Sequence, residues 1–217
     1  MTILDHDFIE INTENGNLYG GNQNRFKSKR LKGYACGPVA VSNILAYDKY
    51  SKNGIKSIDE DAYNDIFKRI SYYIPVIPRF GVNGIFMTIG LNLFFIFHKE
   101  KRFAVWGLFF AGIYGKIKRA LDKDEPVVLA IGPNFPNLFG KKTVGIYTKS
   151  AEGYHLTWQS RAHYVTVTGI DSEWIRISTW GREAYINRNE YSEYVKKHSL
   201  GLFSNVMIIH NMGKTKH

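Results

Sequence analysis

The chain contains a single cysteine, Cys36, which stands directly before Gly37-Pro38 and a run of residues with apolar members at helical spacing. One cysteine excludes an intramolecular disulfide framework and a zinc site built from several thiolates of the chain. The fold must therefore be held by a hydrophobic core, for which 217 residues, 44% of them hydrophobic, are sufficient. We predict a single domain spanning residues 1–217.

The first half of the chain carries helix signals. Apolar residues recur at helical spacing from Pro38 to about Tyr50, and proline suits a first helical turn because its missing N–H needs no partner there. Cys36 would then lie at the helix N-terminus. Further helices are predicted over residues 57–73, 85–97 and 114–122.

The second half changes to strand patterns. Residues 127–131 form a continuous β-branched apolar run, and residues 163–170 alternate along the chain. Two more strands are predicted over residues 174–179 and 203–209. The chain is therefore predicted to have an α+β fold. Its parts would be an irregular arm over 1–32, a mainly helical part over 33–123 and a mainly sheet part over 124–217.

The net charge is +10, but lysines and arginines are scattered and no nucleic-acid motif accompanies them. We therefore expect no nucleic-acid partner. No metal is expected either, because the histidines show no paired ligand spacing.

The most apolar stretch, Gly84 to Phe97, is shorter than the roughly 20 residues that cross a bilayer. We expect a buried element of the core and no membrane partner, with a membrane-surface hairpin as the alternative. The N-terminus has no signal-peptide pattern, so a cytoplasmic location is expected, although a chain trimmed of its leader would look the same.

Cys36 has the surroundings of a reactive thiol. A helix N-terminus stabilises a thiolate through unpaired backbone N–H groups and the helix dipole, so we predict a lowered pKa for this thiol. The alternative is a small buried core cysteine, which is the commoner fate of an isolated cysteine.

His163 opens a predicted strand, and the next strand ends at Ser178-Thr179-Trp180-Gly181. A strand holds an imidazole rigidly, so one nitrogen can reach a sulfur while a polar side chain on the adjacent strand fixes the tautomer. Cys36 is thus the candidate nucleophile and His163 the candidate general base.

The segment Tyr34-Ala35-Cys36-Gly37-Pro38-Val39-Ala40 resembles the nucleophile motif of bacterial papain-like peptidases related to the bacteriocin-processing, double-glycine-leader peptidases. The segment from Ala162 to Ile170 resembles the histidine strand of that family. The resemblance implies a papain-like fold with a helical N-terminal lobe, an antiparallel sheet in the C-terminal lobe and an active-site cleft between them. It also implies a cysteine peptidase that acts through a thioester on Cys36 and needs no cofactor.

The third catalytic position departs from the family pattern. The motif register gives Ser178 where the relatives usually carry Asp or Asn, and a hydroxyl stabilises an imidazolium less than a carboxylate would. Thr179 and Asp171 are the other candidates for orienting His163, although Asp171 at a strand end is more typical of a turn former. Trp180 is expected to pack over His163 and Ser178, or to be a plain core tryptophan.

The oxyanion donor is the second departure. The relatives commonly use a glutamine upstream of the cysteine, and Gln23 can take this part if the arm folds back. Asn22 and Asn24 are neighbouring amides with the same chemistry. Asn43, two helical turns after Cys36, fits a buried structural amide.

These residues favour a cysteine hydrolase that acts on a peptide or another acyl substrate. Two alternatives stay open: an acyltransferase on the same fold, in which an amine or thiol replaces water, and a catalytically silent binding module. Both alternatives stay open because the third catalytic position carries Ser178 and not the Asp or Asn of the family.

Overall fold

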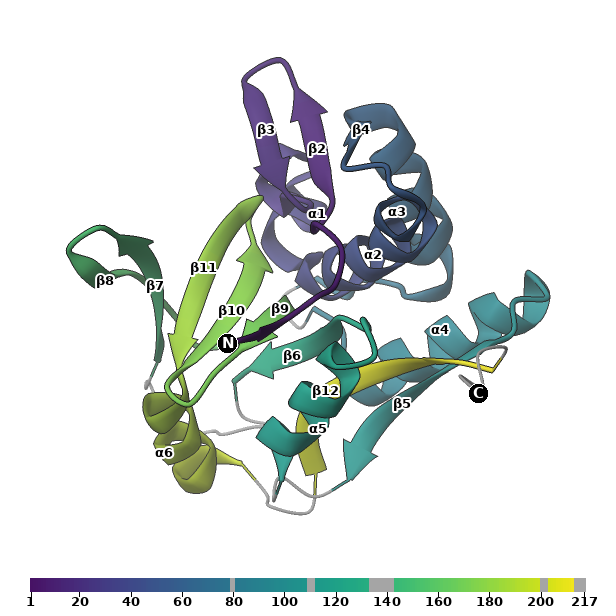
Figure 1. Cartoon of the computed structure of the whole chain (residues 1–217). Helices are drawn as coiled ribbons and strands as arrows, with labels where there is room; N and C mark the ends of the chain where they lie inside the picture. The colour runs from purple at the N-terminus through teal and green to yellow at the C-terminus, as the bar shows by residue number, and fades with distance from the viewer. Residues whose placement is uncertain (79–80, 109–111, 133–142, 200–202, 213–217) are drawn as a thin grey trace.

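The computed structural model describes residues 1–78, 81–108, 112–132, 143–199 and 203–212 (Figure 1). The large sheet contains β1 (Thr2–Ile3), β5 (Arg102–Leu108), β6 (Val127–Ile131), β7 (Val144–Ser150), β8 (Gly153–Ser160), β9 (His163–Ile170), β10 (Trp174–Thr179), β11 (Arg182–Asn187) and β12 (Phe203–Asn211). The small sheet contains β2 (Glu10–Thr13), β3 (Gly16–Tyr19) and β4 (Ser57–Asp59). The helices are η1 (Gln23–Arg25), α1 (Lys29–Tyr34), α2 (Cys36–Lys49), η2 (Ser51–Asn53), α3 (Glu60–Tyr73), α4 (Gly84–Phe97), α5 (Ile113–Leu121) and α6 (Arg188–His198).

The large sheet runs in the order β5-β12-β6-β9-β10-β11-β7-β8, with β1 added beside β9. Its described strand pairs are all antiparallel. Strand β9 therefore lies inside the sheet, between β6 and β10, where its backbone is fixed on both sides. The α+β prediction is confirmed.

Helix α2 is the most deeply buried helix next to this sheet. Every residue from Gly37 to Tyr47 is buried, and the Thr166 hydroxyl of β9 donates to the Ala40 carbonyl of α2 at 3.1 Å. This hydrogen bond holds the N-terminus of α2 against the start of β9.

Helix α3 begins with Asp59 as its N-cap, whose side chain accepts from the Ala62 N–H, as the acidic start predicted.

The sequence predicted an irregular arm over the first 32 residues, and this prediction is wrong. Strands β2 and β3 form a hairpin closed by Gly16, which has φ 104°, a conformation that glycine adopts without strain. Strand β2 also pairs in parallel with β4, and β1 pairs with β9. These partners are remote in sequence, so local periodicity gave no sign of them.

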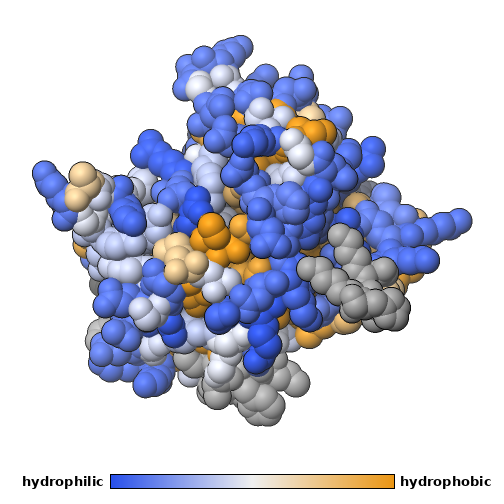
Figure 2. All heavy atoms as spheres, viewed as in Figure 1, coloured by the Kyte–Doolittle hydropathy of each residue, from blue (hydrophilic) through white to orange (hydrophobic). Residues whose placement is uncertain are grey.

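Helix α4 corrects a second expectation. Its helical structure is confirmed, but only one face is buried, and Phe86, Ile96 and Phe97 are 69%, 69% and 68% exposed. Within the described residues, no helix has both the length and the apolar character needed to cross a bilayer. The face of the molecule in Figure 2 is largely hydrophilic, with one hydrophobic area near its centre, close to where β1 begins, and another in the upper part of the view.

Candidate active site

Cys36 is the first residue of α2, as predicted. Backbone N–H groups of Tyr164, Gly37 and Cys36 itself interact with the sulfur and lower the pKa of the thiol. Burial has the larger effect and raises this pKa, contrary to the prediction of a lowered value. The helix N-terminus is present, but the desolvated sulfur is held as a neutral thiol.

His163 is the first residue of β9, and its Nε2 atom lies 2.7 Å from the Thr179 hydroxyl oxygen on β10. The Trp180 indole stacks on the imidazole, with 4.5 Å between ring centroids and 16° between planes. Burial lowers the pKa of His163 to about 4. The imidazole is therefore neutral at pH 7, and the predicted packing of Trp180 over His163 is confirmed.

Thr179, and not Ser178, contacts the imidazole. The pairing of Thr166 with Ser178 puts these two side chains on one face of the sheet. His163 lies three residues before Thr166 and so faces the other side, which Thr179 shares. The Ser178 hydroxyl instead donates to the Tyr19 carbonyl at 2.7 Å.

A β-bulge explains why Thr179, and not the predicted Ser178, faces His163. The register between β9 and β10 shifts between Arg176 and Ile177. Without that shift, Ser178 would pair with Val167 and would share a face with His163. One inserted residue reverses which side chains face the imidazole.

Asn43 joins the N-terminal segment to the site, as the reading of a buried structural amide predicted. Its Oδ1 accepts from the Gly21 N–H at 2.7 Å and from the Tyr63 hydroxyl at 2.9 Å. Its Nδ2 donates to the Thr166 hydroxyl at 3.2 Å and lies 3.4 Å from the Ser178 hydroxyl. This buried network fixes the position of the chain that precedes Gln23.

Gln23 is buried, and its Nε2 donates to the Lys32 carbonyl at 2.8 Å. The N-terminal segment does bring this amide to the cavity that Cys36 lines. Asn22 instead caps η1, because its side chain accepts from the Asn24 N–H. Asp171 accepts from the Glu173 and Trp174 N–H groups, as a turn former does.

One small cavity gathers the candidate residues. Its lining includes Gln23, Cys36, His163, Thr179 and Trp180. The cavity volume is about 10 Å³, which is room for about one water molecule. Cys36 itself is partly exposed, so a substrate carbonyl can approach it from the surface, although the cavity is too small to hold a peptide side chain.

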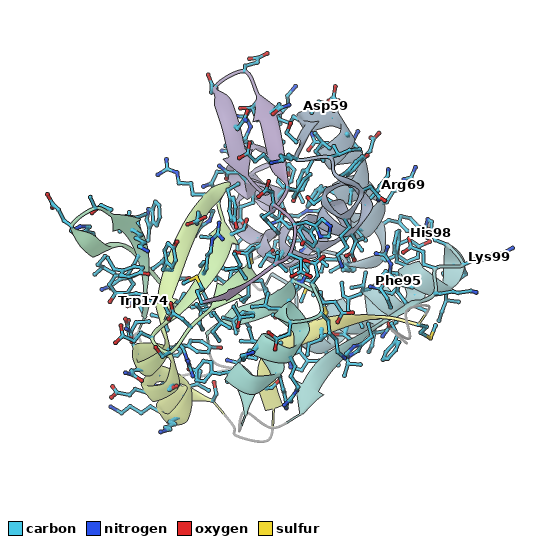
Figure 3. The ribbon with its side chains drawn as sticks, in the orientation of Figure 1. Asp59, Arg69, Phe95, His98, Lys99 and Trp174 are labelled. Atoms are coloured by element: carbon cyan, nitrogen blue, oxygen red, sulfur yellow. The ribbon has the colours of Figure 1, made fainter. Side chains whose placement is uncertain are left out.

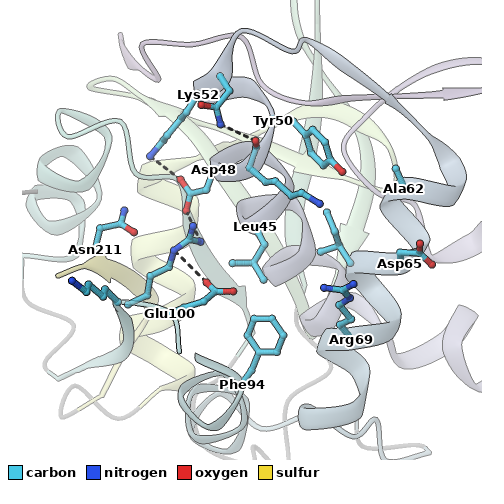
Figure 4. Close-up of a pocket in the computed structure, with 15 residues that line it drawn as sticks. Leu45, Asp48, Tyr50, Lys52, Ala62, Asp65, Arg69, Phe94, Glu100 and Asn211 are labelled. Carbon is cyan, nitrogen blue, oxygen red and sulfur yellow. Dashed lines mark hydrogen bonds and ion pairs between the residues drawn. The ribbon is translucent and has the colours of Figure 1, made fainter. Parts of the chain in front are cut away.

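A larger cavity, of about 830 Å³, lies at the other end of α2 (Figure 4). Asp48 is at its centre and forms ion pairs with Lys52 at 2.7 Å and with Arg102 at 3.3 Å, while Leu45 and Phe94 supply apolar walls. Its charges serve mainly to hold α2, η2 and β5 together. Its described lining residues include no cysteine, serine or histidine. Among the described residues, no group of three or more His, Cys, Asp and Glu side chains is placed to hold a metal ion.

The backbone N–H of Tyr164 at the sulfur was not predicted, because no side-chain pattern reveals a backbone donor. Thr179 was predicted from the sequence as an alternative to Ser178. The choice between the two residues depends on the position of the bulge, which the sequence does not reveal.

No protein-family model matches the chain, and no curated protein matches its sequence. The chain is similar to the crystal structure of a protein from Bacillus anthracis that is provisionally described as a C39-like peptidase. The TM-score is 0.52, and the match covers 89% of this chain and 94% of that one. With 13% identity, the likeness concerns the fold. The chain therefore shares the fold of that protein.

Proposed function

We propose that this protein is a cysteine hydrolase that cleaves a peptide bond through a thioester on Cys36. One observation carries the proposal: Cys36 and His163 line the same cavity, with a backbone N–H on the sulfur and a hydroxyl on Nε2 of the imidazole. A small core cysteine would not need that arrangement. The resemblance to the double-glycine-leader peptidases favours a peptide as the substrate.

In the first step, the sulfur attacks the peptide carbonyl carbon while its proton passes to Nδ1 of His163, since Nε2 is engaged by Thr179. The C–N bond then breaks, the amine leaves with that proton, and the acyl group stays on Cys36. Water next attacks the thioester and returns Cys36 as a thiol. The Cys36 N–H, together with the Gln23 amide, is our candidate for the oxyanion site.

The neutral resting pair suits a site that is activated when substrate binds. Burial opposes both the thiolate and the imidazolium in the free protein, because each charge would be poorly solvated there. Cys36 is partly exposed, so a bound substrate can bring a polar carbonyl to the sulfur. Proton transfer from sulfur to imidazole would then become favourable.

The same burial also supports a second candidate, a silent binding module with the fold of a peptidase. The two functions are separated by incubating the protein with a diverse peptide mixture in ¹⁸O-labelled water and analysing the products by mass spectrometry. We expect ¹⁸O in the new carboxyl groups, and no products from Cys36→Ala or His163→Gln. His155→Gln is the matched control, because His155 lies on β8 and contacts Ser150.

Cleavage that persists in Cys36→Ala would contradict the proposal. An acyl group transferred to an added amine without cleavage by water would identify an acyltransferase instead. No product and no acyl-enzyme from any peptide would favour the binding module.

A further inference from the structure

Helix α4 is apolar on two faces, and the part of the chain that the structure describes covers only one of them. Met87, Leu91, Phe94 and Phe95 are buried in the core. The large apolar side chains that remain more than 40% exposed on the same helix are Ile85, Phe86, Ile89, Leu93, Ile96 and Phe97. A helix on the surface of a globular protein normally turns polar residues outward, so this second face needs an explanation.

The exposed side chains form one stripe, which we call the α4 stripe. At about 100° per residue, Ile85, Ile89, Leu93 and Ile96 follow one line along the helix, and Phe86 and Phe97 flank it. The helix has 14 residues, which gives the stripe a length of about 21 Å. Contiguous apolar patches of this kind mark interaction sites.

The charges around the α4 stripe are mainly positive. Residues 74–99 contain no Asp or Glu. Lys99 lies at the C-terminal end of α4 (Figure 3), and Lys101 follows two residues later. Arg69 of α3 lines a cavity together with Phe94 of α4. The nearest following carboxylate, that of Glu100, lies 3.4 Å from the Arg102 guanidinium. The rim of the stripe is therefore basic in a protein whose net charge is +10.

Tyrosines flank the same end of the helix. The Tyr73 ring lies 6.1 Å from that of Phe97, and Tyr72, 5.2 Å from Tyr73, is 83% exposed. Tyrosine favours the boundary between apolar chains and polar headgroups because its ring is apolar and its hydroxyl is polar. The stripe thus combines an apolar centre, an aromatic flank and a basic rim.

These charges disfavour a second copy of the chain as the occupant. Antiparallel packing of two α4 helices would put Lys99 and Lys101 of one copy over the helix N-terminus of the other, which is the positive end of its dipole. Parallel packing would put the two basic ends side by side. An anionic lipid surface complements the basic rim in either orientation.

We propose that the α4 stripe docks the protein on an anionic lipid bilayer, with α4 lying in the plane of the interface. Helix α4 is too short to cross the bilayer, so the docking is peripheral. Apolar side chains enter the boundary between headgroups and acyl chains, and the basic rim contacts the headgroups. This inference replaces the expectation of no membrane partner, which assumed that the segment is wholly buried.

Sedimentation with phosphatidylcholine vesicles, with and without phosphatidylglycerol, tests the proposal on the full chain. The wild type should bind the vesicles that contain phosphatidylglycerol, and less tightly as salt rises. The double variant Phe86→Gln, Ile96→Gln should lose at least about tenfold in partitioning. Glutamine is a better helix former than either residue it replaces, so the fold should persist, as circular dichroism would check.

A matched control carries the same substitutions elsewhere. Ile55 and Leu156 are 45% and 52% exposed, and β8, which carries Leu156, lies on the opposite side of the molecule from α4 (Figure 1). Ile55→Gln with Leu156→Gln should bind vesicles as the wild type does. Lys99→Gln with Lys101→Gln should weaken binding only where phosphatidylglycerol is present.

Three results would overturn the proposal. The wild type could fail to bind either kind of vesicle, or the α4 double variant could bind as tightly as the wild type. Sedimentation velocity gives the third: a wild-type dimer that Phe86→Gln, Ile96→Gln converts to a monomer, without vesicle binding, would assign the stripe to a second copy.

Discussion

The Nε2 atom of His163 and the hydroxyl oxygen of Thr179 are 2.7 Å apart, which makes Thr179 the side chain that orients the imidazole. A hydroxyl can donate or accept, so it can satisfy Nε2 in either neutral tautomer and in the imidazolium. A carboxylate in its place would favour the imidazolium much more strongly. This pairing therefore agrees with a histidine whose pKa is lowered to about 4.

Thr179→Val should lower the rate of acyl-enzyme formation by about tenfold, because valine keeps the shape of threonine but cannot hold Nε2. The measurement is the single-turnover rate with whichever peptide the wild type cleaves. Thermal unfolding should show a fold close to that of the wild type.

Ser178→Ala is the matched control for Thr179→Val. Its hydroxyl contacts the Tyr19 carbonyl, so its loss should lower the free energy of unfolding by about 1 kcal/mol and should change turnover much less. If turnover falls with Ser178→Ala and not with Thr179→Val, then Thr179 is not the residue that supports His163 in catalysis, although the two are hydrogen-bonded.

The comparison of Ser178 with Thr179 shows how far sequence can define this site. Local patterns placed Cys36 at a helix N-terminus and His163 at the start of a strand, since each depends on nearby residues. The third residue depends on the register between β9 and β10, which the bulge at Arg176 and Ile177 changes by one residue. A bulge has no periodic signal in a single sequence.

The N-terminal segment shows the same limit. Strands β2 and β4 pair although they lie far apart in the sequence, and Gly20 fits against the site only because it lacks a side chain. A Cβ at Gly20, where φ is 75°, would lie 2.5 Å from the Ser178 hydroxyl oxygen. Such contacts are set by tertiary packing, so composition alone suggested an irregular arm.

The burial of His163 should make stability depend on pH. An unfolded chain takes up a proton on this histidine near pH 6.5, whereas the folded protein does so only near pH 4. The unfolded state therefore binds more protons between these values, and falling pH favours it. The contribution of His163 to the free energy of unfolding is complete above about pH 6.5. It is lost as the pH falls toward 4, and the loss is at most about 3 kcal/mol.

Urea unfolding of the wild type and His163→Gln at several pH values measures this contribution. The difference in unfolding free energy between the two proteins should shrink as the pH falls from 7 to 4, because groups common to both cancel. His155→Gln, at an exposed position of β8, is measured alongside as the matched control variant. A difference independent of pH would mean that His163 is not desolvated in solution.

Gly37→Ala should destabilise the protein because the added methyl group meets a packed wall. A Cβ at this position would lie 2.5 Å from Val82 Cγ1 and 3.0 Å from Met87 Sδ. We expect a loss of about 1 to 3 kcal/mol in the free energy of unfolding, together with slower acylation as the backbone beside Cys36 shifts.

Gly33→Ala is the matched control for Gly37→Ala. Gly33 lies in α1, and a Cβ there would meet nothing within 4 Å. Alanine should stabilise this helix by about 0.5 to 1 kcal/mol, as it does at open helical positions. Equal losses from both variants would show that the wall formed by Val82 and Met87 is not packed as described.

The last prediction concerns the reactivity of Cys36. Because burial raises the pKa of its thiol, alkylation by iodoacetamide should accelerate only above the ordinary thiol pKa, and should be slow at pH 7 until denaturant is added. Mass spectrometry reports the site without ambiguity, since Cys36 is the only cysteine. A peptidyl vinyl sulfone, whose peptide part can bind as a substrate would, should label the native protein faster than iodoacetamide, and His163→Gln should abolish that advantage. An alkylation rate that is already maximal below pH 7 would show a preformed thiolate and contradict the neutral resting pair. Slow labelling by both reagents would instead identify Cys36 as a structural cysteine.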